Sequence, residues 1–256
     1  MPSTMLRAGD DRVAPLVCVH PVSGRADDYR LLAAAVSWPG PVLGISAPDP
    51  SRDSFLLPDL ASRYTDELDL RLPVLLLGWS VGGVIAAEMT RTITARGGNV
   101  AFLGVLDSRA PQPEMRTRPT DRETLARFFV YQTALTREQV PPPPLSSTTV
   151  PDLLAALRAS GADAGIGDEA ELDLRLEILI ALTRAFFHHD QQAIPVKMHL
   201  FETADAHPSH PRPATLGWDH LVPSIEKRVI GGTHFTLMAP RFTEALAQTI
   251  SACLPR

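Results

Sequence analysis

Short apolar runs of strand length recur along the first 110 residues, and segments with helical spacing of apolar positions separate them. The runs lie at 16–19, 42–47, 74–77 and 100–106. The helical segments lie at 27–36, 58–72 and 84–96. Asp27 is placed to cap the first of them, and Pro58 opens the second at a first helical position. Because the runs are apolar almost throughout rather than alternating, they predict a parallel sheet covered by helices on both faces.

The alternation of strand and helix breaks at residue 111. Three helix-like segments follow, at 121–135, 150–160 and 169–188, with four consecutive prolines at 141–144 between the first two. The alternation then resumes with a strand at 196–203, a short helix at 218–225, a strand at 227–230 and a helix at 241–254. We therefore predict three parts: an N-terminal tail or linker at 1–14, an α/β core made of 15–110 and 191–256, and a helical lid insertion at 111–190.

Composition and charge exclude several classes of function. The net charge of −5 comes without clusters of lysine and arginine, which argues against nucleic-acid binding. No apolar stretch reaches the length of a membrane span, and the first ten residues lack the apolar core of a signal peptide. Only Cys18 and Cys253 occur, and Cys18 lies inside an apolar run, as a buried small hydrophobe would. We therefore expect a cytoplasmic monomer that binds neither nucleic acid nor membrane.

A five-residue motif follows the apolar run at 74–77. It reads Gly78-Trp79-Ser80-Val81-Gly82 and stands between a predicted strand and a predicted helix, the context of a nucleophile elbow. Such a turn holds the serine hydroxyl exposed, and it needs glycine at both ends because the strand and helix backbones pass too closely for a Cβ. Gly-x-Ser-x-Gly alone is common, but this context predicts that Ser80 is a nucleophile.

A serine nucleophile needs a base, and seven of the eight histidines follow Ser80 in the chain. His234 is the prediction, because it stands between the last predicted strand and the last predicted helix, in a loop that can face the elbow. His207 and His210 lie in a proline-broken loop and lack a third ligand at fixed spacing. We therefore expect no metal site.

Two aspartates compete to orient this histidine. Asp107 ends the strand that follows the elbow helix, and Asp205 ends the later strand at 196–203. Both strand ends lie at the carboxyl edge of the sheet, where the sites of open α/β folds form. Position alone does not choose between them.

Two backbone amides are candidates for an oxyanion hole. The N–H of the residue after the nucleophile, Val81, is one, and the loop after the first core strand supplies the other. In that loop Pro21 has no N–H, so we expect Val22 to be the second donor. We expect His20 to order the loop rather than to take part in the chemistry.

Six segments of the chain together resemble one known family. They are Val17-Cys-Val-His-Pro-Val-Ser-Gly24, Asp28-Tyr29, Leu43-Gly-Ile-Ser-Ala-Pro48, Leu76-Leu-Gly-Trp-Ser-Val-Gly-Gly83, Val105-Leu-Asp-Ser108 and Gly231-Gly-Thr-His-Phe235. As an ordered set they resemble the thioesterase domains of nonribosomal peptide synthetases, from about residue 16 to residue 254. The resemblance implies an α/β-hydrolase fold and assigns the acid to Asp107. The implied catalytic triad is Ser80, Asp107 and His234, and the implied oxyanion hole is Val22 and Val81.

The resemblance also implies a reaction. Trp79 before the nucleophile resembles the integrated, chain-terminating type, with no cofactor of its own. An acyl or peptidyl chain would arrive on the 4′-phosphopantetheine of a carrier protein, pass to Ser80 and leave by macrocyclisation or hydrolysis. The lid residues expected to contact that chain are Phe128, Phe129, Tyr131, Phe186 and Phe187. The alternatives are a stand-alone proofreading thioesterase, a small-molecule serine esterase and, from another class, a non-catalytic binding protein.

Overall fold

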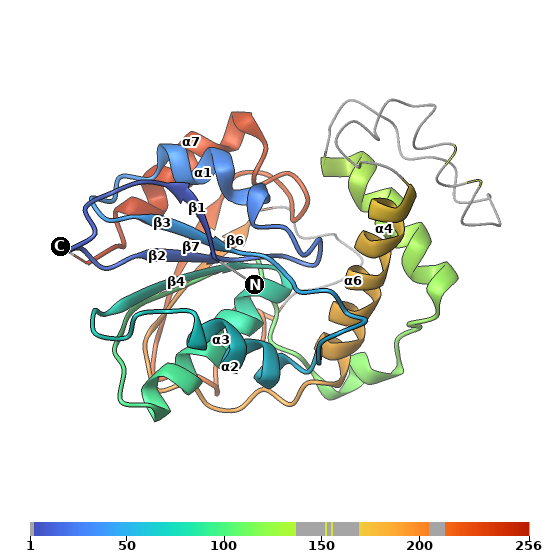
Figure 1. Cartoon of the computed structure of the whole chain (residues 1–256), viewed down its shortest axis with the longest axis horizontal. Helices are drawn as coiled ribbons and strands as arrows, with labels where there is room; N and C mark the ends of the chain where they lie inside the picture. The colour runs from blue at the N-terminus through green and yellow to red at the C-terminus, as the bar shows by residue number, and fades with distance from the viewer. Residues whose placement is uncertain (1–2, 137–151, 153–154, 156–168, 205–212, 256) are drawn as a thin grey trace.

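A seven-stranded sheet forms the centre of the computed structural model, which describes residues 3–136, 152, 155, 169–204 and 213–255 (Figure 1). Within these residues the strand order is β1-β3-β2-β4-β5-β6-β7, with β1 antiparallel to β3 and every other neighbouring pair parallel. The strands are β1 (Thr4–Arg7), β2 (Leu16–Val19), β3 (Val42–Ile45), β4 (Val74–Trp79), β5 (Val100–Leu106), β6 (Met198–Thr203) and β7 (Ile225–Ile230). The predicted mostly parallel sheet is thus confirmed.

Helices cover both faces of the sheet, as the uniformly apolar strands predicted. β4 shows the reason, because Val74 and Leu76 pack into one core cluster while Leu75 and Leu77 pack into the other. The first cluster lies under α2 (Leu57–Asp66) and α3 (Val81–Ala95). The second lies under α1 (Arg30–Ala35) and α7 (Pro240–Ser251), which pack together on the opposite face in Figure 1.

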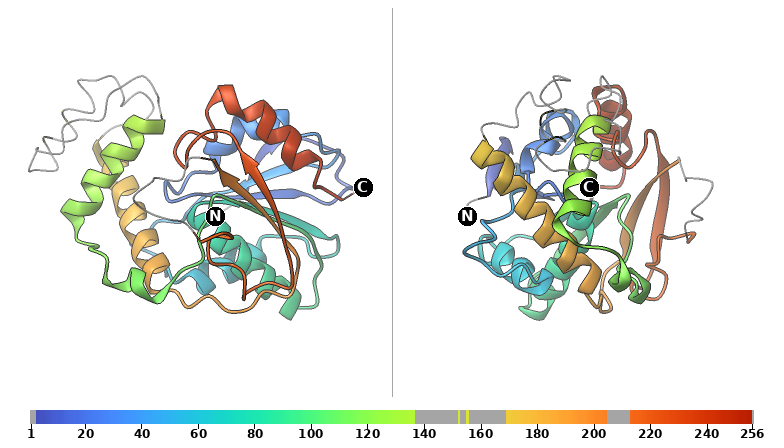
Figure 2. Two further views of the ribbon diagram at one scale, coloured as in Figure 1. Left: turned by 180° about the vertical axis from the view of Figure 1, so that it is seen from behind. Right: turned by 90° about the vertical axis from the view of Figure 1, so that its right-hand side faces the viewer.

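Two long helices stand beside this sandwich. They are α4 (Arg122–Thr136) and α6 (Glu169–His188), preceded by the 3₁₀ helix η2 (Pro113–Thr117). Figure 2 shows α4 and α6 side by side at one end of the molecule, and they contact each other directly. Their shared apolar side chains form a third, smaller cluster that includes Leu125, Phe129, Leu176 and Leu179. The helices predicted at 121–135 and 169–188 are therefore confirmed, and their role as a lid stays a prediction; the predicted segment at 150–160 lies largely outside the described residues.

Three local predictions need correction. Thr4–Arg7, expected within a tail, forms the edge strand β1. Asp27 does not cap a helix: the segment begins as the 3₁₀ helix η1 (Ala26–Tyr29), whose capping residue makes no side-chain hydrogen bond, and Asp27 instead pairs with arginines. The predicted helix at 218–225 is a series of turns, because Leu216 and Gly217 both have positive φ and turn the chain just before it.

No helix in the described part of the chain combines the length and hydrophobicity needed to cross a bilayer.

Candidate active site

Ser80 occupies the sharp turn between β4 and α3. Its φ of 57° and ψ of −129° lie in a region that residues with a side chain rarely adopt. Such a conformation costs of order 1–3 kcal/mol and persists where the surroundings impose it. Here a Cβ on Gly78 would collide with the backbone of Gly82, and a Cβ on Gly82 would collide with the carbonyl oxygens of Val19 and His20. The close backbone approach predicted for the two glycines of the elbow is confirmed.

A series of hydrogen bonds connects Ser80 with two residues that are distant in the chain. The Ser80 hydroxyl lies 3.1 Å from Nε2 of His234, and Nδ1 of the same ring lies 2.8 Å from an oxygen of Asp107. Because a carboxylate only accepts, Nδ1 carries the proton and Nε2 is the acceptor for the serine hydroxyl. The structure therefore brings together the three side chains that the resemblance singled out.

Asp107 is held rigidly at the end of β5. Its φ is 42°, its amide donates to the Phe201 carbonyl at 2.7 Å, and only 4% of the residue is exposed. Its second carboxylate oxygen accepts hydrogen bonds from the Thr203 amide and the Thr203 hydroxyl, both at 3.0 Å. These bonds fix the carboxylate so that its other oxygen faces His234. The competing acid, Asp205, lies outside the described residues.

The loop after β2 is pinned by His20, which is fully buried. Its Nδ1–H donates to the Pro21 carbonyl at 2.8 Å, and its Nε2 accepts from the Tyr64 hydroxyl at 2.7 Å. Burial lowers the pKa of His20 from 6.5 to about 4, against a smaller opposing effect of the Pro21 carbonyl, so the ring is neutral at neutral pH. The expectation that His20 orders this loop agrees with these contacts.

Two amides beside the nucleophile are available to a ligand. Val81 is the first residue of α3, where N–H groups lack partners within the helix. Val22 lies in the pinned loop and lines the same cavity as Ser80. In the described part of the chain, neither amide donates to a backbone or side-chain acceptor. Both can therefore serve a developing oxyanion.

A buried tyrosine links the two loops that carry these amides. The Tyr29 hydroxyl donates to the Val19 carbonyl at 2.8 Å and accepts from the Trp79 amide at 2.7 Å. Val19 and Gly78 are the last paired residues of β2 and β4, so the hydroxyl lies just beyond the end of their ladder. Sequence analysis noted Tyr29 only as part of a motif and did not foresee this position.

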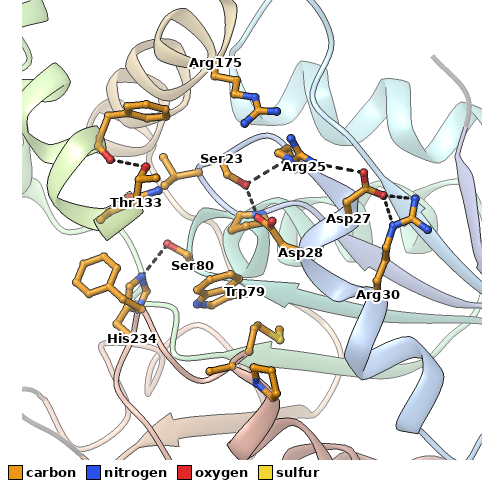
Figure 3. Close-up of a pocket in the computed structure, with 18 residues that line it drawn as sticks. Ser23, Arg25, Asp27, Asp28, Arg30, Trp79, Ser80, Thr133, Arg175 and His234 are labelled. Carbon is orange, nitrogen blue, oxygen red and sulfur yellow. Dashed lines mark hydrogen bonds and ion pairs between the residues drawn. The ribbon is translucent and has the colours of Figure 1, made fainter. Parts of the chain in front are cut away.

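Ser80 opens onto a cavity of about 520 Å³ (Figure 3). Trp79, His234 and Phe235 line it from the core, and Phe129, Gln132 and Thr133 line it from α4. Of the five lid aromatic residues predicted to contact substrate, Phe129 alone lines this cavity in the part of the chain that the structure describes.

The other four predicted lid residues lie elsewhere. Phe128 and Tyr131 meet Phe235 edge to face, with ring centroids 6.3 and 6.5 Å apart. Phe187 lies under the Arg118 guanidinium, and Phe186 packs against the core cluster below α3. Neither Phe186 nor Phe187 lines the cavity of Ser80, and their contact with substrate stays a prediction.

One part of the same cavity is charged and was not predicted from the sequence. Arg25, Asp27, Asp28 and Arg30 follow the pinned loop, and Arg175 reaches the cavity from α6 (Figure 3). Four charges within six residues, immediately after a loop already assigned to the site, are the signal that could have found them.

Metal ligands are absent from this arrangement. Among the described residues, no group of three or more histidine, cysteine, aspartate or glutamate side chains could hold a metal ion. His207 and His210 lie outside those residues. What the described site offers is a serine, a base, an acid and free amides, the set needed for acyl transfer.

Comparison with known sequences places the chain among related proteins. The family model described as "Thioesterase domain" matches residues 14–254. Thioesterase pytI of Aspergillus terreus is 30% identical over 187 residues, which are 63% of this chain and 60% of that protein. Enterobactin synthase component F of Escherichia coli (strain K12) is 28% identical over 171 residues, 63% of this chain and 13% of that protein. The chain thus spans less than two thirds of the length of these curated relatives.

Solved structures show the same fold. A four-domain nonribosomal peptide synthetase, holo-AB3403, superposes with a TM-score of 0.87 at 23% identity over 99% of this chain and 20% of the synthetase. The NocB thioesterase domain superposes with a TM-score of 0.69 at 24% identity over 95% of both chains. The fold is therefore that of the α/β-hydrolase thioesterase domains. With a family model that extends over nearly its whole length, this chain belongs to the thioesterase domain family.

Proposed function

We propose that this chain releases an acyl or peptidyl chain from the phosphopantetheine thioester of a carrier protein, through an acyl-enzyme on Ser80. The observation that supports this most is the hydrogen-bonded series Ser80–His234–Asp107, whose serine opens onto a cavity. Membership in the thioesterase family and the likeness to synthetase domains support the thioester substrate.

The acylation step follows from the proton positions. His234 Nε2 takes the proton of Ser80 as the hydroxyl oxygen attacks the thioester carbonyl. The negative charge that develops on the carbonyl oxygen is stabilised by the amides of Val22 and Val81. The carbon–sulfur bond then breaks, and the proton on His234 passes to the departing thiol. Asp107, held by Thr203, keeps the ring oriented and stabilises its charged form.

The second step reuses the same groups. His234 removes a proton either from water or from an amine or hydroxyl of the bound chain, and the resulting nucleophile attacks the carbonyl carbon of the acyl-serine. The ester bond to the Ser80 oxygen then breaks, and His234 returns the proton to that oxygen. Water gives the free acid, whereas a group of the chain itself gives a ring. Which one reacts depends on how far the cavity walls exclude water and fold the chain back on itself. Phe129 on α4 forms part of that wall.

Mass spectrometry with a synthetic peptidyl N-acetylcysteamine thioester tests the proposal. We expect an acyl adduct on the wild-type protein and none on Ser80→Ala, with turnover at least about 10⁴-fold slower and an unchanged circular dichroism spectrum. A cyclic product would be lighter than the free acid by one water. An adduct that persists on Ser80→Ala would overturn the proposal. Rapid turnover of aryl esters with none of thioesters would instead favour a small-molecule esterase.

A further inference from the structure

Asp28 is the most unusual charged group in the cavity of Ser80. The residue lines the cavity and is partly buried, and the Ser23 hydroxyl donates to its carboxylate at 2.5 Å. In the described part of the chain, no arginine, lysine or histidine forms an ion pair with it. In Figure 3 it lies between the nucleophile and the outer pair of Asp27 and Arg30.

The arginines that line the cavity each contact a carboxylate other than Asp28. Arg30 pairs with Asp27 at 2.9 Å, and Arg25 lies 3.5 Å from Asp27 and 3.9 Å from Glu171. Arg175 pairs with Glu171 one turn earlier on α6. Three arginines thus share two carboxylates, whereas the direct contact of Asp28 is with a neutral hydroxyl.

The surroundings of Asp28 favour a cationic ligand. Burial raises the pKa of its carboxyl, against the opposing effects of the Ser23 hydroxyl and of Arg25 and Arg175 acting from a distance. A desolvated carboxylate is stabilised when a cation contacts it directly and makes a charge-assisted hydrogen bond. An ammonium group supplies the charge and three donors in a compact form.

We propose that Asp28 is a specificity residue of the acyl site, and that it binds an ammonium group carried by the acyl chain on Ser80. The inference rests on the proposed function, since it assigns a chemical class to the substrate of the same cavity. A chain that carries an amine would thus be held at two points, its carbonyl at Ser80 and its ammonium at Asp28.

The size of the cavity sets the length of chain that can make both contacts. A volume of 520 Å³ corresponds to a sphere about 10 Å across, which about three extended residues would span. The ammonium group should therefore lie within a few residues of the thioester carbonyl. It can be the amino terminus of a short peptide or the side-chain amine of a residue near the end of a longer one.

A series of N-acetylcysteamine thioesters tests this site. The chains are ω-aminoacyl groups of graded length, each paired with an ω-hydroxyacyl and an ω-carboxyacyl chain of the same length. Release of thiol counts both hydrolysis and cyclisation. At the best length we expect kcat/KM for the amino chain to exceed that for the hydroxy chain by about 10- to 100-fold, the range of a charged hydrogen bond. A preference for the carboxyl chain, or none at any length, would overturn the inference.

Asp28→Asn separates the carboxylate from the rest of the cavity. Asparagine keeps the shape and an acceptor for the Ser23 hydroxyl, so we expect the ratio of kcat/KM for the amino chain to kcat/KM for the hydroxy chain to fall towards one. Asp27→Asn is the matched control, because Asp27 lines the same cavity but is paired with Arg30, and the amino-to-hydroxy ratio should survive there. Equal loss of the ratio in both variants would contradict a direct contact at Asp28.

The outcomes also separate this inference from the proposed function. Cleavage of the hydroxyacyl chain without preference for the amine would refute the ammonium site and leave the proposed function in place. Failure of the wild-type protein to cleave any thioester would refute both. The wild-type preference needs no variant, and labelling of Ser80 by a fluorophosphonate reports whether Asp28→Asn remains correctly folded.

Discussion

The two sides of the cavity are built by different means. On the core side, the turn of Ser80, the loop of His20 and the carboxylate of Asp107 are fixed by hydrogen bonds between elements far apart in the chain. On the lid side, α4 and α6 share a small apolar cluster of their own, and Ile178 and Leu182 of α6 also pack into the core cluster. The catalytic groups are thus held by directional hydrogen bonds, whereas the wall of the cavity on the side of α4 and α6 depends on apolar packing.

The largest effect should come from the carboxylate on the core side. Asp107→Asn removes the acceptor that keeps the proton on Nδ1 of His234, so we expect kcat to fall by about 10⁴-fold. Stopped-flow turnover of a peptidyl thioester measures it. Asp205→Asn is the control, with little expected change. The reverse pattern would transfer the acid role to Asp205.

The buried His20 in the loop after β2 should make the free energy of unfolding depend on pH. His20 has a folded-state pKa of about 4, below the value of about 6.5 expected when unfolded. As the pH falls from 6.5 towards 4, the unfolded chain binds a proton that the folded protein does not, so the free energy of unfolding should fall by about 3 kcal/mol in total. Above pH 6.5 this contribution vanishes. Urea titrations of wild type and His20→Gln at several pH values give the free energy of unfolding as a function of pH. Between pH 4 and 6.5 we expect this free energy to fall more steeply with decreasing pH in the wild type than in the variant. Parallel plots for the two proteins would argue against a neutral, buried His20.

Two tyrosines allow a direct comparison of core and lid. Tyr29→Phe leaves the Val19 carbonyl and the Trp79 amide without their partner, so the free energy of unfolding should drop by about 1–3 kcal/mol. We expect slower labelling of Ser80 by a fluorophosphonate as well, because the residue before it is no longer held. Tyr131→Phe on α4 should change neither quantity, since the Tyr131 ring, which the substitution keeps, packs against Phe235. Equal effects of the two substitutions would contradict the view that hydrogen bonds hold the core side and apolar packing holds the lid side.

The smallest effect should come from the lid wall. Phe129→Ala enlarges the cavity and admits water, so we expect a few-fold rise in KM for peptidyl thioesters and a larger share of hydrolysed product. Labelling of Ser80 by a small fluorophosphonate should stay near the wild-type rate. Phe187→Ala, which alters a side chain away from the cavity, should leave the product ratio unchanged. A strong loss of labelling in Phe129→Ala would mean that the lid also holds the nucleophile.

Most of the catalytic site on the core side could be predicted, because short stretches of sequence specify its turns. An apolar run of strand length, glycines at 78 and 82 and a helical run beyond them specify the elbow without knowledge of the rest of the chain. The loop of His234 follows from the order of strand, glycines and helix in the same way. The acid could not be chosen in this way, because the sequence places both Asp107 and Asp205 at the ends of predicted strands. The fold brings Asp107 at the end of β5 to the histidine.

The misplaced elements share a dependence on distant contacts. At 218–225 the apolar residues are spaced as in a helix, but they are apolar because they are buried in a non-helical segment. Trp218 is fully buried, and its indole N–H donates to the Ser108 carbonyl. β1 is four residues long and half exposed, so its pattern of apolar residues does not predict a strand. The strand is defined by its pairing with β3. The lid aromatic residues were predicted as a group, but tertiary packing separates them: Phe129 lines the cavity, whereas Phe186 packs against the core cluster and Phe187 lies under Arg118.

The crowding around Gly82 bears on how such a site can be altered, whether by selection or by design. No side chain fits at this position, because the start of α3 and the loop after β2 are in direct backbone contact there. The separation of the amides of Val81 and Val22 is therefore a property of the backbone framework and cannot be adjusted by single substitutions in either segment. Variation among substrates must then enter through the charged segment at 25–30 and the lid. The chain can acquire a new preference without rebuilding its reaction centre.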